Sequence, residues 1–172
     1  MSDKPVVPGR QLEVPPLAGA SLHRALTGDA PELLVLQRCC WVDEAIANDT
    51  LDVQALHESL DDVRAWIEAW STWCVRVGGR LVGAVRARQE GSSWEIGRLM
   101  VAPDLTGQGL GGWLLRFAED QGPGDVESIT LFTGLRSLRN IAMYEGAGFR
   151  RTVASAPPGA VRLVKERAAQ PR

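Results

Sequence analysis

Apolar residues change their spacing near Thr72, and this change separates a helical region from a strand region. Before it, apolar side chains recur every three or four positions, the period of a helix with one buried face. After it, apolar and polar positions alternate in short runs, which is typical of strands. The helical series consists of Leu56, Leu60, Val63, Ile67 and Trp70. It predicts a helix from Val53 onward with a break near Ser59.

The amino-terminal part predicts an extended lead-in, one strand and one helix. Four prolines within residues 1–19 favour an extended, poorly ordered segment. Residues 22–26 are predicted as the first strand. Asp29, followed by Pro31 and an acid, is typical of a helix start, so a helix is expected from there to about Ile46. Its expected core-facing side chains are Leu33, Leu36 and Cys40.

Three consecutive strands are predicted after Thr72, joined by short turns. Two successive glycines, Gly78 and Gly79, are a strong signal for a two-residue hairpin, and residues 90–93 form the next turn. Strands joined in this way pair antiparallel. The predicted strands span residues 73–77, 81–88 and 94–101.

The rest of the chain predicts two helices and three strands. The first helix begins at Leu110 and ends near Gln121, before a Gly-Pro-Gly stop. The other elements are a strand at 126–133, a helix at 137–147, and strands at 149–153 and 161–166. The order β-α-α-β-β-β-α-β-α-β-β indicates an α/β (α+β) fold with about four helices and a mixed, mostly antiparallel sheet of about seven strands. One domain is expected at 20–167, followed by a flexible tail at 168–172.

A glycine-rich turn before the helix at Leu110 carries the clearest chemical signal. Gly107, Gly109, Gly111 and Gly112 permit positive φ and carry no Cβ, so several backbone N–H groups can converge on one oxyanion. The following helix adds free N-terminal donors and the positive end of its dipole. A diphosphate is the ligand that suits such a turn.

The same turn has the Gly-x-Gly-x-x-Gly spacing of a Rossmann dinucleotide site. A Rossmann turn follows its strand directly, and an acid ends the next strand. Here residues 103–105 separate the strand from the glycines, and Asp125 and Glu127 fall at the wrong end of the next strand. The sequence therefore does not favour a dinucleotide.

Composition narrows the class of partner. With 19 basic and 21 acidic residues, a net charge of −2 and no polybasic run, the chain does not fit an electrostatic nucleic-acid binder. Three cysteines, two of them adjacent, fit neither a disulfide framework nor a zinc spacing. His23 and His57 have no partners at ligand spacing, so no metal is expected. No apolar stretch reaches membrane length and the N-terminal prolines do not fit a signal peptide, so a cytoplasmic protein without membrane contact is expected.

Two separated motifs resemble the Gcn5-related N-acetyltransferase (GNAT) family. Residues 106–111, Thr-Gly-Gln-Gly-Leu-Gly, keep both glycines of the family's Gln/Arg-x-x-Gly-x-Gly/Ala turn, with threonine at the first position. Residues 137–149 look like the family's Asn-x-x-Ala-x-x-x-Tyr-x-x-x-Gly-Phe, with Ser137 at the asparagine position and Asn140 at the alanine position. The resemblance extends to the order of elements from Leu22 to Glu166, and it implies acetyl-CoA (coenzyme A) as the cofactor.

The resemblance also implies where the cofactor binds. The main chain at the end of the third consecutive strand pairs with the pantetheine amides as an added strand would, and the splay between that strand and the next opens the groove. For this strand, side-chain packing in the core and backbone contact with the cofactor are compatible. The implied cofactor-binding residues are Leu99, Met100, Val101, Thr106, Gly107, Gln108, Gly109, Leu110, Gly111, Gly112, Ser137 and Asn140.

Acyl transfer to an ammonium group needs one residue that takes a proton and one that protonates the departing thiolate. Tyr144, the chain's only tyrosine, matches the family's tyrosine and is predicted as the acid; packing against the cofactor is the alternative. Glu95 falls where several family members keep a general base, and an exposed carboxylate or salt-bridge partner is its alternative. Arg98 and Arg139 are expected as surface cations rather than phosphate contacts.

The sequence does not identify the acceptor substrate. Family members shape the acceptor pocket in the segment that runs here from Trp41 to Asp52, but a solvated helix face explains its acids as well. The predicted function is an acetyl-CoA-dependent N-acetyltransferase acting on a small-molecule or protein amine. A non-catalytic acyl-CoA-binding regulatory module and a domain without cofactor are the alternatives. An exposed strand at the C-terminal edge would allow a homodimer.

Overall fold

A seven-stranded sheet forms the centre of the fold in the computed structural model, which describes residues 14–154 and 156–167. The strands are β1 (Ala20–Arg24), β2 (Ser71–Val77), β3 (Arg80–Glu90), β4 (Ser93–Val101), β5 (Ser128–Gly134), β6 (Arg150–Thr152) and β7 (Ala160–Glu166). Their spatial order is β1-β2-β3-β4-β5-β7-β6. All neighbours pair antiparallel except β4 and β5, which are parallel. The predicted mixed, mostly antiparallel sheet is confirmed.

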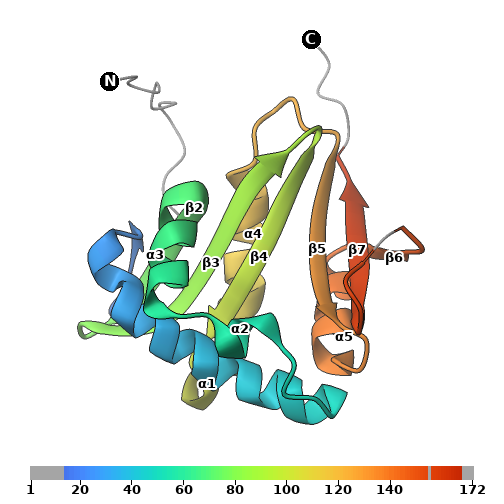
Figure 1. The fold of residues 1–172 in the computed structure, drawn as a ribbon. Helices are drawn as coiled ribbons and strands as arrows, with labels where there is room; N and C mark the ends of the chain where they lie inside the picture. The colour runs from blue at the N-terminus through green and yellow to red at the C-terminus, as the bar shows by residue number, and fades with distance from the viewer. Residues whose placement is uncertain (1–13, 155, 168–172) are drawn as a thin grey trace.

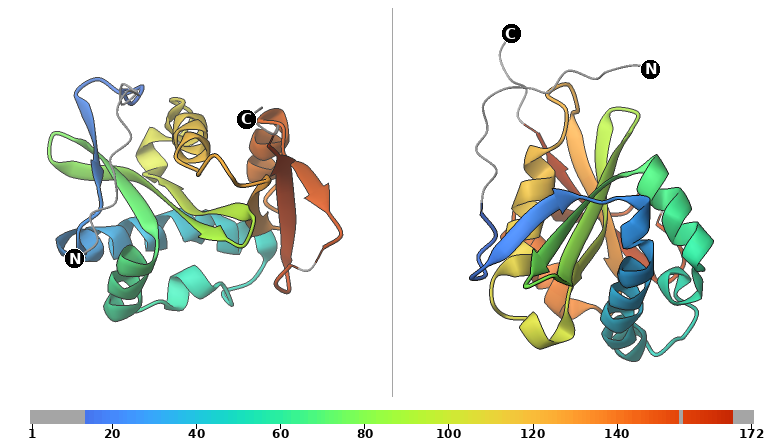
Figure 2. Two further views of the ribbon diagram at one scale, coloured as in Figure 1. Left: turned by 90° about the horizontal axis from the view of Figure 1, so that it is seen from above. Right: turned by 90° about the vertical axis from the view of Figure 1, so that its left-hand side faces the viewer.

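Helices pack on both faces of this sheet. In the described ranges they are α1 (Ala30–Asn48), α2 (Gln54–His57), α3 (Leu60–Ala69), α4 (Leu110–Asp120) and α5 (Leu138–Gly146), with 3₁₀ turns at 27–29 and 103–105. Figures 1 and 2 show α1 to α3 on one face and α4 and α5 on the other. None of these helices has the length and apolar character needed to cross a membrane. The predicted order holds, with one more helix than expected.

The additional helix arises at Ser59, where the sequence predicts a break. Ser59 Oγ accepts a hydrogen bond from the Asp62 N–H at 3.2 Å, and Asp62 Oδ2 accepts one from the Ser59 N–H at 2.7 Å. This reciprocal pair satisfies two backbone donors at the start of α3. The chain therefore ends α2 and starts a new helix instead of continuing one.

The first strand lies two residues before its predicted position. It spans Ala20–Arg24 rather than 22–26, because the Leu26 N–H donates to Asp29 Oδ2 at 2.8 Å and the chain turns there toward α1. A side chain that binds the backbone three residues earlier offers an alternative to strand pairing. Because Leu26 is apolar, the sequence pattern favours a strand there and does not indicate this turn.

Part of the predicted lead-in is folded. Residues 1–13, like the predicted tail at 168–172, lie outside the described residues. Within 14–19, Pro15 is buried and Leu17 packs against the core. Residues 14–19 therefore pack against the domain, and the poor order of the lead-in stays a prediction.

The core beneath the sheet is built around α4. The apolar face predicted for this helix is buried. Trp113 and Phe117 stack with ring centroids 5.4 Å apart, and Trp73 of β2 meets Phe117 edge-on at 5.4 Å. Aromatic packing of this kind fixes the position of the helix, and with it the glycine turn that precedes it.

Strands β4 and β5 remain paired over only three residues. Ser93–Glu95 pair with Ser128–Thr130, and beyond these residues the two strands diverge (Figure 1). A β-bulge at Arg98, where φ is 47°, shifts the register between β3 and β4 and bends β4. The splay predicted between these two strands, β4 and β5, is therefore present.

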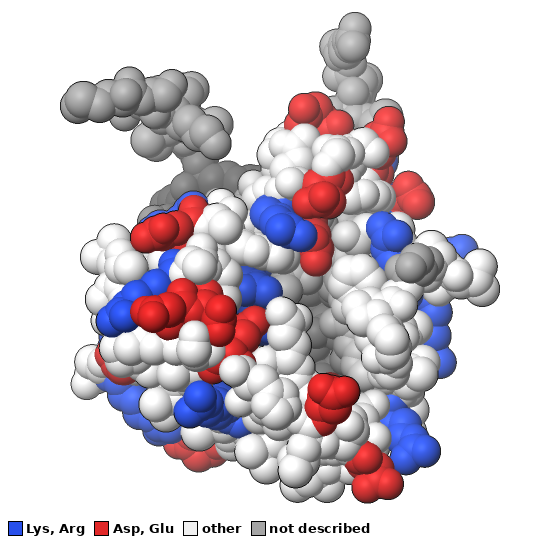
Figure 3. Space-filling view, viewed as in Figure 1, with Lys and Arg blue, Asp and Glu red and all other residues white. Residues whose placement is uncertain are grey.

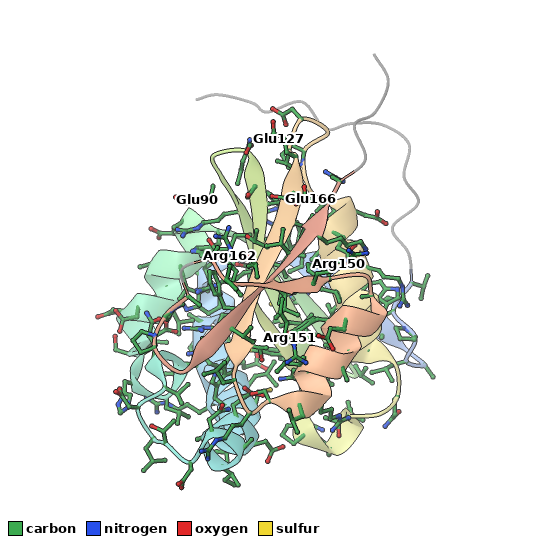
Figure 4. The ribbon with its side chains drawn as sticks, turned by 90° about the vertical axis from the view of Figure 1, so that its right-hand side faces the viewer. Glu90, Glu127, Arg150, Arg151, Arg162 and Glu166 are labelled. Atoms are coloured by element: carbon green, nitrogen blue, oxygen red, sulfur yellow. The ribbon has the colours of Figure 1, made fainter. Side chains whose placement is uncertain are left out.

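The sheet ends at β6, a short edge strand. Figure 4 shows Arg150 and Arg151 on it, and Arg151 Nε pairs with Glu145 Oε1 at 2.8 Å. Short, charged edges disfavour pairing with a second chain. A homodimer through this edge stays a prediction.

Gly134 ends β5 at the point where α1 reaches it. A Cβ at Gly134 would lie 2.7 Å from Asn48 Cγ, and Asn48 is held by bonds to Ser137 Oγ at 3.0 Å and the Arg136 N–H at 2.9 Å. We expect Gly134→Ala to lower the free energy of unfolding by about 1–3 kcal/mol because this amide must move. Urea denaturation measures the loss.

The matched control is Gly146→Ala at the end of α5. A Cβ there meets nothing within 4 Å, so a change smaller than about 1 kcal/mol is expected. Equal stabilities for the two variants would contradict the close approach of α1 to β5.

Candidate active site

The divergence of β4 and β5 opens a cavity of about 1400 Å³. Figure 3 shows the surface hollowed between the two halves of the sheet, with acidic and basic side chains together at the upper end. The cavity is lined by α1, the diverging strands, α5 and the glycine turn. One continuous space therefore connects the turn with the residues predicted to move protons.

The glycine turn has the backbone geometry of an anion site. Gly107 and Gly109 have φ values of 82° and 87°, which residues with a Cβ rarely adopt. A Cβ at either position would meet nothing within 4 Å, so the space in front of the turn is open. Gly111 and Gly112 instead lie inside α4 and do not have positive φ, so their contact with the cofactor, through their N–H groups, stays a prediction.

The first turn of α4 supplies further donors. Its first hydrogen bond runs from the Trp113 N–H to Gly109 O at 3.1 Å, so the N–H groups of residues 110–112 precede the helical ladder. A Cβ at Gly112 would lie 3.5 Å from Arg116 Nη1, which places a cation over this turn. Arg116 is not among the residues predicted from the sequence, and its i,i+4 spacing from Gly112 is the signal that indicates it. Free N–H groups beside a cation suit a diphosphate.

Three other turn residues take different positions. Thr106 Oγ1 donates to Pro103 O at 3.0 Å and closes its own turn. Gln108 is exposed and does not line the cavity, so its contact with the cofactor stays a prediction. Leu110 is buried in the core, so its backbone alone is available to a ligand.

The free edge of β4 presents backbone groups to the cavity. The Ala102 N–H donates to Val82 O of β3 at 2.8 Å, and backbone groups along a strand point to alternating sides. Those of Leu99 and Val101 therefore face the gap, and both residues line the cavity. Met100 pairs with β3 and is buried, so its contact with the cofactor stays a prediction.

Glu44 of α1 connects to the start of α5. Its Oε2 accepts a hydrogen bond from Ser137 Oγ and its Oε1 accepts one from Asn140 Nδ2, both at 2.5 Å. Ser137 and Asn140 line the cavity, but these donors serve Glu44, so their contact with the cofactor stays a prediction. Sequence reasoning did not single out Glu44 among the acids of its segment.

Tyr144 lies beside this network. It is 7% exposed, lines the cavity and meets the Phe149 ring edge-on at 6.2 Å. Burial, and secondarily the charge of Glu44, raise the pKa of Tyr144 above its ordinary value. Its hydroxyl therefore remains protonated and is a hydrogen-bond donor.

Glu95 lines the cavity from β4. Arg88 Nη2 contacts Glu95 Oε2 at 3.1 Å, and the carboxylate side chain is 19% exposed. Oε1 has no hydrogen-bond partner among the residues the structure describes. The salt bridge thus holds the side chain at the cavity wall and leaves one oxygen available.

Arg98 is not the surface cation that we expected. Its side chain is 13% exposed, and its Nη2 contacts Oε1 of the buried Glu58 at 2.6 Å. Gln37 Nε2 donates to the same carboxylate at 2.8 Å. The ion pair therefore joins the β4 bulge to α1 and to the start of α3. Arg139 is exposed at the cavity rim, as expected.

Cys40 is the cysteine that lines the cavity. Its Sγ donates to Val101 O at 3.2 Å, and burial raises the pKa of the thiol to about 12. A protonated thiol is a poor nucleophile. Cys40 is therefore not suited to carry an acyl group.

His23 has closer partners than expected. The ligand atoms of His23, Asp29 and Cys74 lie within 4.8 Å of one another, outside the cavity. Arg76 Nη2 contacts Asp29 Oδ1 at 2.8 Å, and burial raises the pKa of Cys74 to about 12. A carboxylate paired with arginine beside a protonated thiol is a poor metal site. His57 lines the cavity and contacts Leu51 O at 2.8 Å.

Comparisons with known proteins agree with this arrangement. The sequence profile described as "Acetyltransferase (GNAT) family" matches residues 32–149, which include the turn, the β4 edge and Tyr144. The UPF0157 protein YqkA of Bacillus subtilis (strain 168) is 29% identical over 122 residues, which are 71% of this chain and 35% of that protein. The chain thus spans about a third of the length of this relative.

Solved acetyltransferases share the fold. The PaiA N-acetyltransferase of Thermoplasma acidophilum, solved with coenzyme A, has a TM-score of 0.63 at 13% identity, covering 86% of this chain and 99% of that one. An acetyltransferase of Thermus thermophilus has a TM-score of 0.66 at 18% identity, covering 86% and 96%. Because the profile matches more than half of the chain, the chain belongs to the acetyltransferase (GNAT) family, whose cofactor is acetyl-CoA.

Proposed function

We propose that the chain is an N-acetyltransferase that moves an acetyl group from a thioester to a primary amine by direct attack. One observation carries this proposal: a single cavity contains a backbone anion site, the free edge of β4 and protonatable side chains. The new C–N bond forms as the C–S bond breaks, the nitrogen loses a proton, and the sulfur gains one. Acetyl-CoA supplies the activated acyl group when bound.

The residues present fit this cofactor. The N–H groups of residues 107–112 and the guanidinium of Arg116 would hold the diphosphate, and the backbone of Leu99 and Val101 would pair with the pantetheine amides. Backbone pairing would fix a flexible chain along the strand, so that the reactive carbonyl would lie in the cavity.

Glu44 and Glu95 are among the acidic residues that line the cavity, and their bonding separates them as candidates for the base. Both oxygens of Glu44 accept hydrogen bonds from Asn140 and Ser137, whereas Oε1 of Glu95 is available. Glu95 is therefore the base that takes the ammonium proton, directly or through water. The Glu44 carboxylate lies beside Tyr144 and attracts the cationic acceptor.

Tyr144 acts at the leaving group. Its raised pKa makes full transfer of its proton unfavourable, but a neutral phenol donates a strong hydrogen bond to an anion. The hydroxyl thus stabilises the negative charge that develops on sulfur, and water supplies the proton that completes the reaction. The protonated Cys40 supports direct attack over transfer through a cysteine.

The test is thiol release from acetyl-CoA with a broad panel of primary amines. Acceleration by at least one amine supports the proposal. A rise in melting temperature with acetyl-CoA but no acceleration by any amine would instead indicate the non-catalytic binding module.

Gly109→Val tests the anion site. The side chain would enter the open space before the turn and displace N–H groups that each contribute about 1.5–3 kcal/mol to binding a charged ligand. We expect the dissociation constant of coenzyme A, measured by calorimetry, to rise roughly tenfold or more.

The control for this variant is Gly78→Val in the β2–β3 turn. It introduces the same strain of positive φ, 54° at Gly78, away from the cavity. Normal affinity in a folded Gly109→Val protein would refute the placement of the diphosphate.

Tyr144→Phe tests the leaving-group role. The ring contact with Phe149 is retained and the hydroxyl is removed. Turnover is expected to fall roughly 10²-fold, while the affinity for coenzyme A stays within about twofold. Unchanged turnover would remove Tyr144 from the mechanism.

Glu95→Gln tests the base. The acidic limb of the pH–rate profile is expected to disappear, with turnover at neutral pH lowered roughly 10²-fold or more. Glu90→Gln is the control, because Glu90 lies 3.5 Å from the same Arg88 but does not line the cavity. An unaltered profile in the Glu95 variant would transfer the role to Glu44.

A further inference from the structure

Arg86 of β3 lies in the wall of the cavity. Its guanidinium carbon lies 4.2 Å from the Trp70 ring centroid and 4.8 Å from that of Trp66. Its Nε is buried and has no hydrogen-bond partner. Within the described ranges, Arg86 forms neither a hydrogen bond nor an ion pair with protein. The two aromatic rings hold the guanidinium in place and leave its donors unused.

The neighbouring charges are already paired. Arg98 contacts Glu58 at 2.6 Å, and Arg88 contacts Glu95 at 3.1 Å. Among the described residues, Arg86 is therefore the member of this group that forms no ion pair, although the charges of Glu58 and Glu95 act on it from a distance. Buried guanidinium donors are normally satisfied.

The surroundings of Arg86 favour an anion. Burial, and secondarily the charge of Arg98, lower the pKa of Arg86 to about 9, so the charged form is held at a cost in free energy. A negative group bound beside Arg86 would offset this cost. A hydrophobic side chain could pack against the two tryptophans without this cost in free energy. Packing alone therefore does not account for an arginine at this position.

Strand register places Arg86 near the base. Arg86 pairs with Gly97 and Arg88 pairs with Glu95, so Arg86 and Glu95 are diagonal neighbours on one face of the sheet. Such neighbours are about 7–8 Å apart at their backbones. Gly97 has no side chain, and a Cβ there would already lie 3.5 Å from Arg86 Nε. The cavity beside Arg86 is thus kept free of side chains from this strand position.

We infer that the acceptor carries a carboxylate a short distance from its amine, and that Arg86 binds this carboxylate while Glu95 faces the amine. The planar guanidinium fits a carboxylate through two parallel hydrogen bonds. The acceptor class is therefore an amino acid or a short peptide with a free carboxylate. This inference rests on the proposed N-acetyltransferase function.

The test uses acceptors in matched pairs. Amino acids of increasing chain length and short peptides are compared with their primary amides, and thiol release gives kcat/KM for each. The wild-type protein is expected to favour the carboxylate over the amide roughly 10- to 100-fold. In Arg86→Met this ratio should fall to about one, and Arg86→Lys, which keeps the charge but not the planar fork, should give an intermediate ratio.

Arg24→Met is the matched control. Arg24 also stacks on a tryptophan, 5.0 Å from the Trp73 ring centroid, but it does not line the cavity. It should keep the wild-type ratio. Thermal melting confirms that each variant is folded, and Arg86→Gln replaces Arg86→Met if the latter does not fold.

The outcomes separate the two proposals. Transfer with equal kcat/KM within each pair, or an unchanged ratio in the folded Arg86 variants, would overturn the carboxylate site and leave the N-acetyltransferase function intact. If no acceptor accelerates thiol release, the N-acetyltransferase proposal is wrong. A binding measurement then tests the carboxylate site at Arg86 separately. With coenzyme A present, N-acetylated amino acids should then raise the melting temperature of the wild type but not of Arg86→Met; no shift in the wild type would overturn the site.

Discussion

The buried ion pair between Arg98 and Glu58 is the constraint on which the rest of the site depends. Arg98 has a φ of 47°, a conformation that is unfavourable for a residue with a Cβ and persists only where the surroundings hold it. Glu58 holds it through the 2.6 Å contact, and Gln37 fixes the same carboxylate from α1. The bulge that results bends β4, and the cavity is the space that the bent strand leaves beside β5. Loss of either charge would leave the other buried and unpaired, which is strongly destabilising.

Backbone groups and side chains line different walls of the cavity. The turn at 107–109, the first turn of α4 and the edge of β4 offer main-chain groups, which depend on φ values and strand pairing rather than on side-chain identity. The opposite walls offer Glu44, Glu95 and Arg86. The fold therefore fixes a backbone site for a constant ligand, while a few side chains determine which acceptor fits.

Local signals in the sequence predicted the elements well, because periodicity, paired glycines and helix caps act over a few residues. The hairpin at Gly78 and Gly79 and the break at Ser59 are of this kind. Contacts between distant segments were not accessible in the same way. Glu44 lies 96 residues before Asn140, and Arg98 lies 40 residues after Glu58. Nothing in the spacing of a single sequence shows that such residues meet, so the sequence predicted Arg98 as a surface cation.

Arg86 shows how a local sequence signal and contacts between distant segments combine. Its position in a strand between apolar residues would suit Val or Leu, and an arginine there lowers the local fit between sequence and fold. Departures of this kind concentrate at functional sites, where stability is given up for binding. The two tryptophans reduce the cost by packing against the guanidinium, which forms no hydrogen bond with the described residues. A guanidinium selects a planar anion by geometry as well as by charge, so this one residue can set both the charge and the orientation of what enters the cavity.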